Sequence, residues 1–214
     1  MTIAIDFGTS NTVVARWNQA LQQPETLKLP GLSTISAQNP PLIPSLLYVE
    51  NAAQSKVILG QQVRDKGLDL STDSRFFRNF KRGIGTSVRG FLPEIDGQIV
   101  TFEQVGQWFL EQIVGSIREL PLPVDSLVFT VPVDSFEAYR NWLGKVSQSL
   151  QVEQVRMLDE PTAAALGYAV LEDLGPLRDF GGMGELKHLS RSEERRVGKE
   201  RVCECGARWP RDHQ

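Results

Sequence analysis

Two short apolar segments near the N-terminus, separated by a polar turn, constrain the fold of this chain most strongly. Residues 2–6 and 12–17 are rich in Ile, Val and Ala, and the segment between them reads FGTSN. Apolar runs joined by a few turn-forming residues predict a β-hairpin. Successive backbone N–H groups in such a turn form a concave surface that can bind an anion.

Residues 126–174 indicate how this hairpin is extended into a sheet. SLVFTVPV, residues 126–133, is a continuous apolar run, which favours a strand buried on both faces. A helix is expected over 134–150, a strand over 153–158, and a helix from Asp159 onward, with Pro161 in its first turn. Hairpin strands followed by strand–helix pairs predict an α/β fold, with helices on the faces of a mixed sheet.

The central part of the chain predicts a further α/β region. Strands are expected at LLYVE, residues 46–50, and at KVIL, residues 56–59, with a helix starting near Gln61. Residues 101–120 form an amphipathic pattern that predicts a helix, with apolar side chains at Val105, Trp108, Phe109, Ile113 and Ile117.

Composition divides the chain at about residue 187. All 214 residues together carry a net charge of −3, and no apolar run reaches the length of a membrane span. Residues 1–186 contain no Cys or His and carry 15 basic against 21 acidic side chains, whereas residues 187–214 carry 8 basic against 5 acidic. The acidic balance argues against a nucleic-acid-binding surface, and neither a membrane segment nor a signal peptide is evident.

The hairpin turn is the first candidate site. The backbone and hydroxyl groups of its residues can bind phosphate, namely Gly8, Thr9, Ser10 and Asn11. Asp6, at the end of the first strand, can hold a hydrated Mg²⁺ beside that phosphate. The same residue types also suit a plain surface hairpin.

Two charged residues elsewhere are further candidates. Glu160, at a strand-to-helix junction, can act as a base or orient a water, although acidic residues also favour a helix N-terminus for its dipole alone. Lys81, in NFKRGIG, can reach a phosphate as a point charge, although a solvated basic loop has the same composition.

RDFGGMG, residues 178–184, repeats the Asp-Phe-Gly pattern of the N-terminal turn. Asp179 with Gly181 and Gly182 can therefore face the same metal–phosphate group from the opposite side, or form a simple loop. A protein-kinase assignment fails because the catalytic His-Arg-Asp loop is absent, and no P-loop motif is present. Cys203-Glu204-Cys205 is a weak metal signal, since zinc sites need four ligands.

The order of these segments resembles the start of the ATPase domain of the 70-kDa heat-shock (DnaK-type) chaperones, over roughly residues 2–184. IAIDFGTSNTVVA and DEPTAAALGY carry most of the resemblance, with FFRNFKRGIG, LVFTVPVDSFEAYR and DFGG between or after them. The resemblance implies an actin-like, ribonuclease-H-like fold, of which this chain holds only lobe I. Residues 1–45 and 120–184 would form its base subdomain, and 46–119 an inserted smaller α/β subdomain.

The resemblance also implies roles for individual residues. ATP or ADP with Mg²⁺ would bind at the two glycine turns, with Asp6 and Asp179 in the metal shell. Catalysis would involve Lys81, Glu160 and Thr9, and the phosphate contacts would come from Gly8, Thr9, Ser10, Asn11, Gly181 and Gly182. Pro132 and Arg140 match the family's relay between the ATPase lobe and the peptide-binding domain. The expected partners of the parent protein are unfolded client peptides, a J-domain co-chaperone and a nucleotide exchange factor, in a cytoplasmic monomer.

The sequence departs from the family near its end. Met183 and Gly184 stand where the family pattern has Gly and Thr, and nothing after Leu186 resembles the family. We therefore expect residues 187–214 to be disordered or artefactual, and this truncated chain to bind nucleotide weakly with negligible turnover. Two alternatives remain open, an actin-like or cell-shape filament ATPase and an inactive fragment.

Overall fold

The computed structural model describes residues 1–34, 36, 39–70, 72–86, 92–133 and 137–171. The contacts divide the chain into two units, Met1–Leu166 and Gly167–Gln214. All features of the fold and site described below lie within the first unit, apart from the last residues of the final helix.

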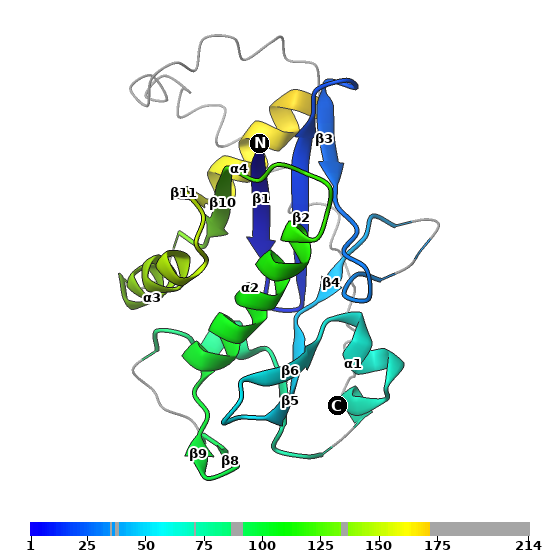
Figure 1. Cartoon of the computed structure of the whole chain (residues 1–214). Coiled ribbons are helices and arrows are strands. Elements are labelled where there is room, and N and C mark those ends of the chain that lie inside the picture. Colours follow the sequence, from blue (N-terminus) through cyan, green and yellow to red (C-terminus); the bar gives the residue numbers. More distant parts are fainter. Residues whose placement is uncertain (35, 37–38, 71, 87–91, 134–136, 172–214) are drawn as a thin grey trace, which may run out of the picture. The chain divides into compact units, whose positions relative to one another are not determined.

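A mixed sheet occupies the first unit (Figure 1). Its main path runs in the order β11-β10-β1-β2-β3, and β4 pairs with β2. The predicted hairpin is confirmed, because β1 and β2 are antiparallel and Ile5 lies opposite Val14. β1 runs parallel to β10, and β10 runs parallel to β11. The bounds are β1 Thr2–Phe7, β2 Asn11–Asn18, β3 Gln23–Thr26, β4 Ile43–Pro44, β10 Ser126–Val131 and β11 Gln154–Asp159.

One face of this sheet is buried, and the opposite face is more open. Ile3, Ile5 and Phe7 alternate with exposed residues along β1, as the two-residue period of a strand requires. β10 shows the same alternation, with Val128 and Thr130 only partly buried. The prediction that β10 is buried on both faces is therefore wrong, because its second face is only partly buried.

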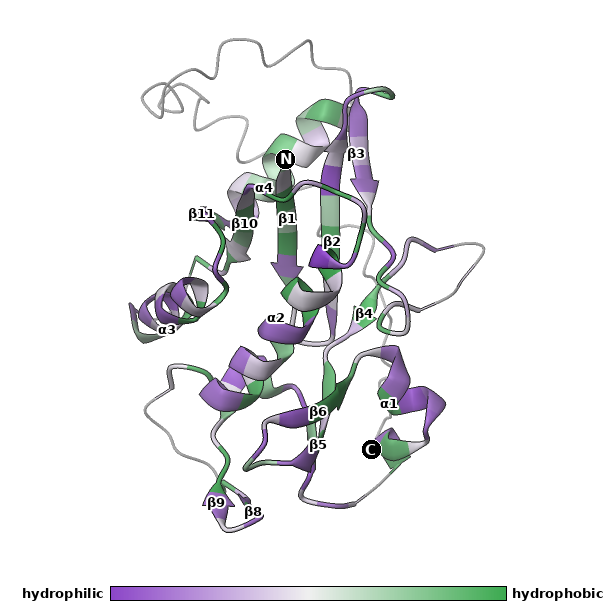
Figure 2. Cartoon of the chain, in the orientation of Figure 1, coloured by the Kyte–Doolittle hydropathy of each residue, from purple (hydrophilic) through white to green (hydrophobic). Residues whose placement is uncertain are grey.

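Helix α2, Phe102–Arg118, supplies much of the core. Thr101 caps it in a reciprocal capping box with Gln104, which satisfies two backbone N–H groups at the helix start. All five apolar positions predicted to face the core are buried. Figure 2 shows α2 alternating between hydrophilic and hydrophobic residues, whereas β1 is largely hydrophobic.

The predicted helices that follow are also present. Helix α3 spans Glu137–Ser149 and helix α4 spans Glu160–Leu171. Residues 134–136, where the first of these was expected to begin, lie outside the described residues. Among the described residues, no helix is both long and apolar enough to cross a membrane.

Residues 46–99 contain two further small sheets. A three-stranded sheet has the order β6-β5-β7 and a two-stranded hairpin consists of β8 and β9. Asp96, in the hairpin turn, accepts hydrogen bonds from the Ala52 backbone N–H and from Arg75, and these bonds lower the pKa of its carboxyl group. The bounds are β5 Leu46–Asn51, β6 Lys56–Leu59, β7 Phe76–Arg78, β8 Glu94–Ile95 and β9 Gln98–Ile99, with helix α1 at Gln61–Asp65 and 3₁₀ turns η1 Leu68–Leu70 and η2 Phe80–Gly83.

A cluster of aromatic rings joins the large sheet to η2 and α2. Phe7, Phe80 and Phe109 are at most 1% exposed, and their ring centroids lie 5.4–6.1 Å apart. Trp142 extends the cluster into α3, with its ring 6.5 Å from that of Phe7. Aromatic pairs at these separations add to the stability that burial alone provides.

Phe109→Ala tests the importance of this cluster. Because the side chain is fully buried, we expect its loss to reduce the free energy of unfolding by about 3–5 kcal/mol. Ile99→Ala, at an exposed position on β9, is the matched control and should change it little. Urea titration followed by tryptophan fluorescence measures both, and equal losses in the two variants would contradict the assignment.

Candidate functional site

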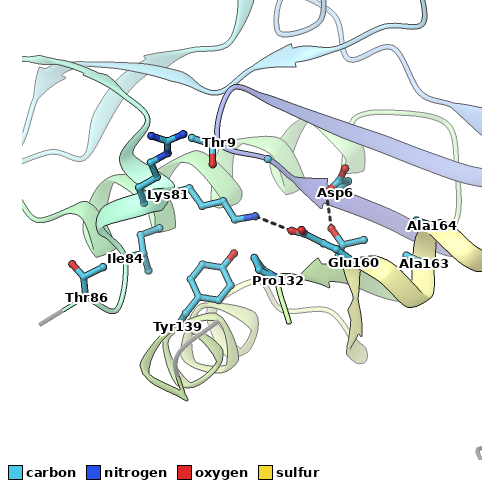
Figure 3. A pocket seen from close by; sticks show the side chains of 13 residues that line it. Asp6, Thr9, Lys81, Ile84, Thr86, Pro132, Tyr139, Glu160, Ala163 and Ala164 are labelled. Atoms are coloured by element: carbon cyan, nitrogen blue, oxygen red, sulfur yellow. Dashed lines mark hydrogen bonds and ion pairs between the residues drawn. The ribbon is translucent and has the colours of Figure 1, made fainter. Parts of the chain in front are cut away.

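An open pocket lies beyond the carboxyl ends of the three parallel strands. It has a volume of about 790 Å³, and its wall includes residues that directly follow or end β1, β10 and β11. Ligands commonly bind at this end of an α/β sheet, because the loops that follow parallel strands converge there. Figure 3 shows the side chains that line this pocket.

Asp6 and Thr130 form a pair on the open face of the sheet. They lie on the adjacent parallel strands β1 and β10, and alternation turns both away from the buried face. The Thr130 hydroxyl donates a hydrogen bond of 2.6 Å to Asp6 Oδ1 (Figure 3). This bond orients the carboxylate, and its remaining lone pairs can serve a hydrated cation.

The turn after β1 is held in shape by a buried serine. Ser45 Oγ donates to the Gly8 carbonyl oxygen at 2.8 Å, and it lies 3.0 Å from Thr12 Oγ1. Since the single hydroxyl hydrogen of Ser45 is used on Gly8, the Thr12 hydroxyl is the donor of the second bond. Glycine is required at position 8, because a Cβ there would lie 2.2 Å from the Asn11 carbonyl oxygen.

Lys81 reaches the pocket from η2. Its Nζ lies 3.2 Å from Glu160 Oε1, 5.6 Å from the ring centre of Phe7 and 5.8 Å from that of Tyr139. The Lys81 side chain is only 9% exposed, so these contacts replace much of the water that an ammonium group normally requires. The Lys81 ammonium group therefore lies inside the pocket, where it is paired with the Glu160 carboxylate.

The glycines around Lys81 allow its loop to pack closely. A Cβ at Gly83 would lie 2.2 Å from the Phe102 ring. Gly85 has a φ of +74°, and a Cβ there would lie 2.7 Å from the Tyr139 backbone nitrogen. These close approaches hold the loop against α2 and α3, and thereby position the backbone that carries Lys81.

Glu160 is the first residue of α4 and directly follows β11. Its neighbour Asp159 accepts a hydrogen bond of 2.6 Å from the Arg140 guanidinium on α3. Both members of that pair are more than one third exposed, so we assign it a local orienting role rather than a large stabilisation. The pair holds the strand-to-helix junction that carries Glu160.

The structure brings together most of the described residues predicted from the sequence. Asp6, Gly8, Thr9, Lys81, Pro132 and Glu160 all line the pocket. Ser10 and Asn11 belong to the same turn but are not part of the pocket wall, and Arg140 acts one residue away from Glu160 through Asp159. Asp179, Gly181 and Gly182 lie outside the described residues, so their placement stays a prediction.

Several residues of the site were not predicted from the sequence, among them Thr130, Ser45, Tyr139 and Arg82. Thr130 could have been found once the pairing of β1 with β10 was known, because the register places it beside Asp6 on the same face of the sheet. Ser45 lies in a loop 37 residues from Gly8, and Tyr139 lies on a helix, so neither carries a local signal.

The charges of the pocket are mixed. Lys81 and Arg82 face Asp6 and Glu160 around the same space. Among the described residues, no group of three or more His, Cys, Asp and Glu side chains could hold a metal ion by itself. Mg²⁺ is commonly bound by one or two carboxylates together with phosphate oxygens, so Asp6 fits a metal that arrives with an anionic ligand.

Comparison with known proteins relates the chain to one group of chaperones. No family model matches the sequence. The chaperone protein DnaK of Elusimicrobium minutum is 28% identical over 78% of this chain, and that of Endomicrobium trichonymphae is 25% identical over 92%. The DnaK of Thermosipho africanus is 25% identical over 78%. The chain is thus similar in sequence to DnaK-type, 70-kDa heat-shock chaperones.

The chain corresponds to only part of the length of the proteins that it matches. The three alignments cover 25%, 32% and 26% of the lengths of those chaperones. The mixed α/β architecture described above is compatible with the relationship.

Ser45→Ala tests the two buried hydrogen bonds through which the Ser45 hydroxyl holds the Gly8 turn. We expect the free energy of unfolding to fall by about 1–3 kcal/mol, because the Gly8 carbonyl and the Thr12 hydroxyl both lose their partner. Ser126→Ala, which removes an exposed hydroxyl pair with Thr2, is the control and should have a smaller effect. Chemical denaturation measures the free energy of unfolding of both variants. An unchanged free energy of unfolding in Ser45→Ala would show that the Ser45 hydrogen bonds do not stabilise the turn.

Proposed function

We propose that this chain is a nucleotide-binding segment of a DnaK-type chaperone, and that its pocket binds the phosphate groups of ATP or ADP with Mg²⁺. One observation carries the proposal. Asp6, the Gly8–Thr9 turn, Lys81 and Glu160 come from three separate regions of the sequence, and they line one pocket. A phosphate-binding turn, a buried cation and two carboxylates are the groups that phosphoryl transfer requires.

Each of these groups would contribute to hydrolysis in a different way. Backbone N–H groups of the turn and the Lys81 ammonium bind and orient the phosphate chain, and the Thr9 hydroxyl adds a donor beside them. Asp6, oriented by Thr130, would hold Mg²⁺, which neutralises charge on the phosphates when bound. Glu160 would position the attacking water and accept its proton.

The similarity to DnaK-type chaperones also supports proposals on the fold of this segment and on the partners of the whole protein. We propose an actin-like, ribonuclease-H-like lobe in which residues 1–45 and 120–184 form the base and 46–119 the inserted subdomain. The division is supported by the strands, since the six-stranded sheet draws on residues 2–44 and 126–159, and the small sheets on residues 46–99. In the whole chaperone, a cytoplasmic monomer, hydrolysis would be coupled through Pro132 and Arg140 to client binding, with a J-domain co-chaperone and an exchange factor.

Binding of Mg·ATP to the chain tests the proposed function directly. Lys81→Met should weaken binding roughly tenfold to a hundredfold, because a charge-assisted contact to phosphate is lost. Lys56→Met is the matched control, since Lys56 pairs with Glu50 on the small sheet away from the pocket. Isothermal titration calorimetry measures the affinity of both variants for Mg·ATP. The absence of Mg·ATP binding to the unaltered chain at millimolar concentration would refute the proposal.

Glu160→Gln separates water positioning from binding. We expect Mg·ATP affinity to stay constant or to rise, because a carboxylate that competes for Lys81 is removed from the pocket. Hydrolysis by the full-length parent chaperone, followed as phosphate release with protein in excess over ATP, should fall roughly a hundredfold. If affinity and hydrolysis instead decline by the same factor, Glu160 is a binding residue and the assigned role is wrong.

A further inference from the structure

Tyr139 has a buried hydroxyl that no described residue satisfies. Tyr139 is the third residue of α3 and is 5% exposed. Its Oη has no hydrogen-bond partner, and it is the one such buried side-chain polar atom among the described residues. A buried hydroxyl without a partner destabilises the folded chain, so its retention calls for an explanation.

The surroundings of Tyr139 point to the phosphate pocket. Its side chain lines the pocket, between Lys81 and Pro132 (Figure 3). Lys81 Nζ lies 5.8 Å from the Tyr139 ring centre and is held there by Glu160. Burial and the nearby carboxylates of Glu160 and Asp6 raise the pKa of the phenol above its usual value, so the group stays protonated as a hydrogen-bond donor.

The neighbouring carboxylates form bonds to other donors and do not reach Tyr139 Oη. Asp6 Oδ1 accepts from Thr130, and Glu160 Oε1 accepts from Lys81. Neither carboxylate is within hydrogen-bond distance of Tyr139 Oη. An acceptor supplied by a ligand is therefore the simplest partner, and the cations Lys81 and Arg82 favour one that is anionic.

We propose that Tyr139 Oη is a ligand-binding group that donates a hydrogen bond to an oxygen of a bound polyphosphate. The identity of that polyphosphate as a nucleotide rests on the proposed function, whereas the contact itself does not. Lys81 Nζ lies 5.8 Å from the Tyr139 ring centre, so a phosphate that attracts Lys81 away from Glu160 approaches the same wall of the pocket. The ligand thus satisfies a donor that is unpaired in the free protein.

Tyr139→Phe in the full 214-residue chain tests this contact. The variant keeps the ring that lies against Lys81 and removes only the hydroxyl. We expect roughly a tenfold or greater loss of affinity for Mg·tripolyphosphate in calorimetry, with a thermal midpoint of the free protein that is unchanged or higher. Tyr168→Phe, at a position 62% exposed and outside the pocket wall, is the control and should change neither quantity.

The outcomes separate this proposal from the proposed function. Loss of tripolyphosphate affinity in Tyr139→Phe supports the contact even if the unaltered chain has no preference for ATP, a result that would refute only the nucleotide assignment. Equal affinity in Tyr139→Phe and the unaltered chain overturns the contact while Mg·ATP binding can stand. A lower thermal midpoint with unaltered affinity would make Tyr139 merely structural. Absence of binding to either ligand refutes both proposals.

A second measurement does not depend on folding of the variant. The chain has three tyrosines, so ¹³C labelling of the ring carbon bonded to oxygen gives three resonances, and Tyr48→Phe with Tyr168→Phe identifies that of Tyr139 by elimination. We expect the Tyr139 resonance to shift on addition of Mg·tripolyphosphate. If it stays constant while the ligand binds, Oη gains no new partner and the proposal fails.

Discussion

The parallel pairing of β1 with β10 is the contact on which the pocket depends. It joins segments more than one hundred residues apart, with Ile3 opposite Leu127 and Ile5 opposite Phe129. This register puts Asp6 beside Thr130 and brings the carboxyl ends of the strands to one edge. β11 then pairs with β10 in the same direction and delivers Glu160 to that edge. A shift by one residue would turn Asp6 into the core.

The aromatic cluster beneath the pocket has a second role besides stability. Phe7 ends β1 and Phe80 begins η2, so the contact between their rings links the strand that carries Asp6 to the turn that carries Lys81. Close packing restricts the movement of both backbones. The long Lys81 side chain extends from this packed base into the pocket, where its Nζ lies 5.6 Å from the Phe7 ring centre and 5.8 Å from that of Tyr139.

Local patterns predicted the strands and helices well, and long-range contacts account for what they could not predict. The buried apolar face of α2 follows from the helical spacing of its apolar residues. The β1–β2 hairpin follows from two apolar segments joined by a polar turn. β3 contains Pro24 and β4 is only two residues long, so neither shows a strand pattern; both form because β2 offers an edge. The candidate residues Asp6, Lys81 and Glu160 were found from motifs and a family resemblance. Ser45 and Tyr139 act through partners distant in sequence, and no local rule identifies them.

The ion pair between Lys81 and Glu160 gives the free pocket a balanced charge. A phosphate that enters must attract Lys81 away from a carboxylate 3.2 Å distant, and the freed Glu160 then faces the same ligand as a like charge. A cation bound with the phosphate would reduce this repulsion, and Asp6, which lines the same pocket, is the residue proposed to hold it. The pocket is therefore better suited to a metal–phosphate complex than to a bare anion. In the proposed complex, Glu160 would be released from Lys81 and would serve as the proton acceptor, so ligand binding itself would produce the arrangement that the proposed hydrolysis needs.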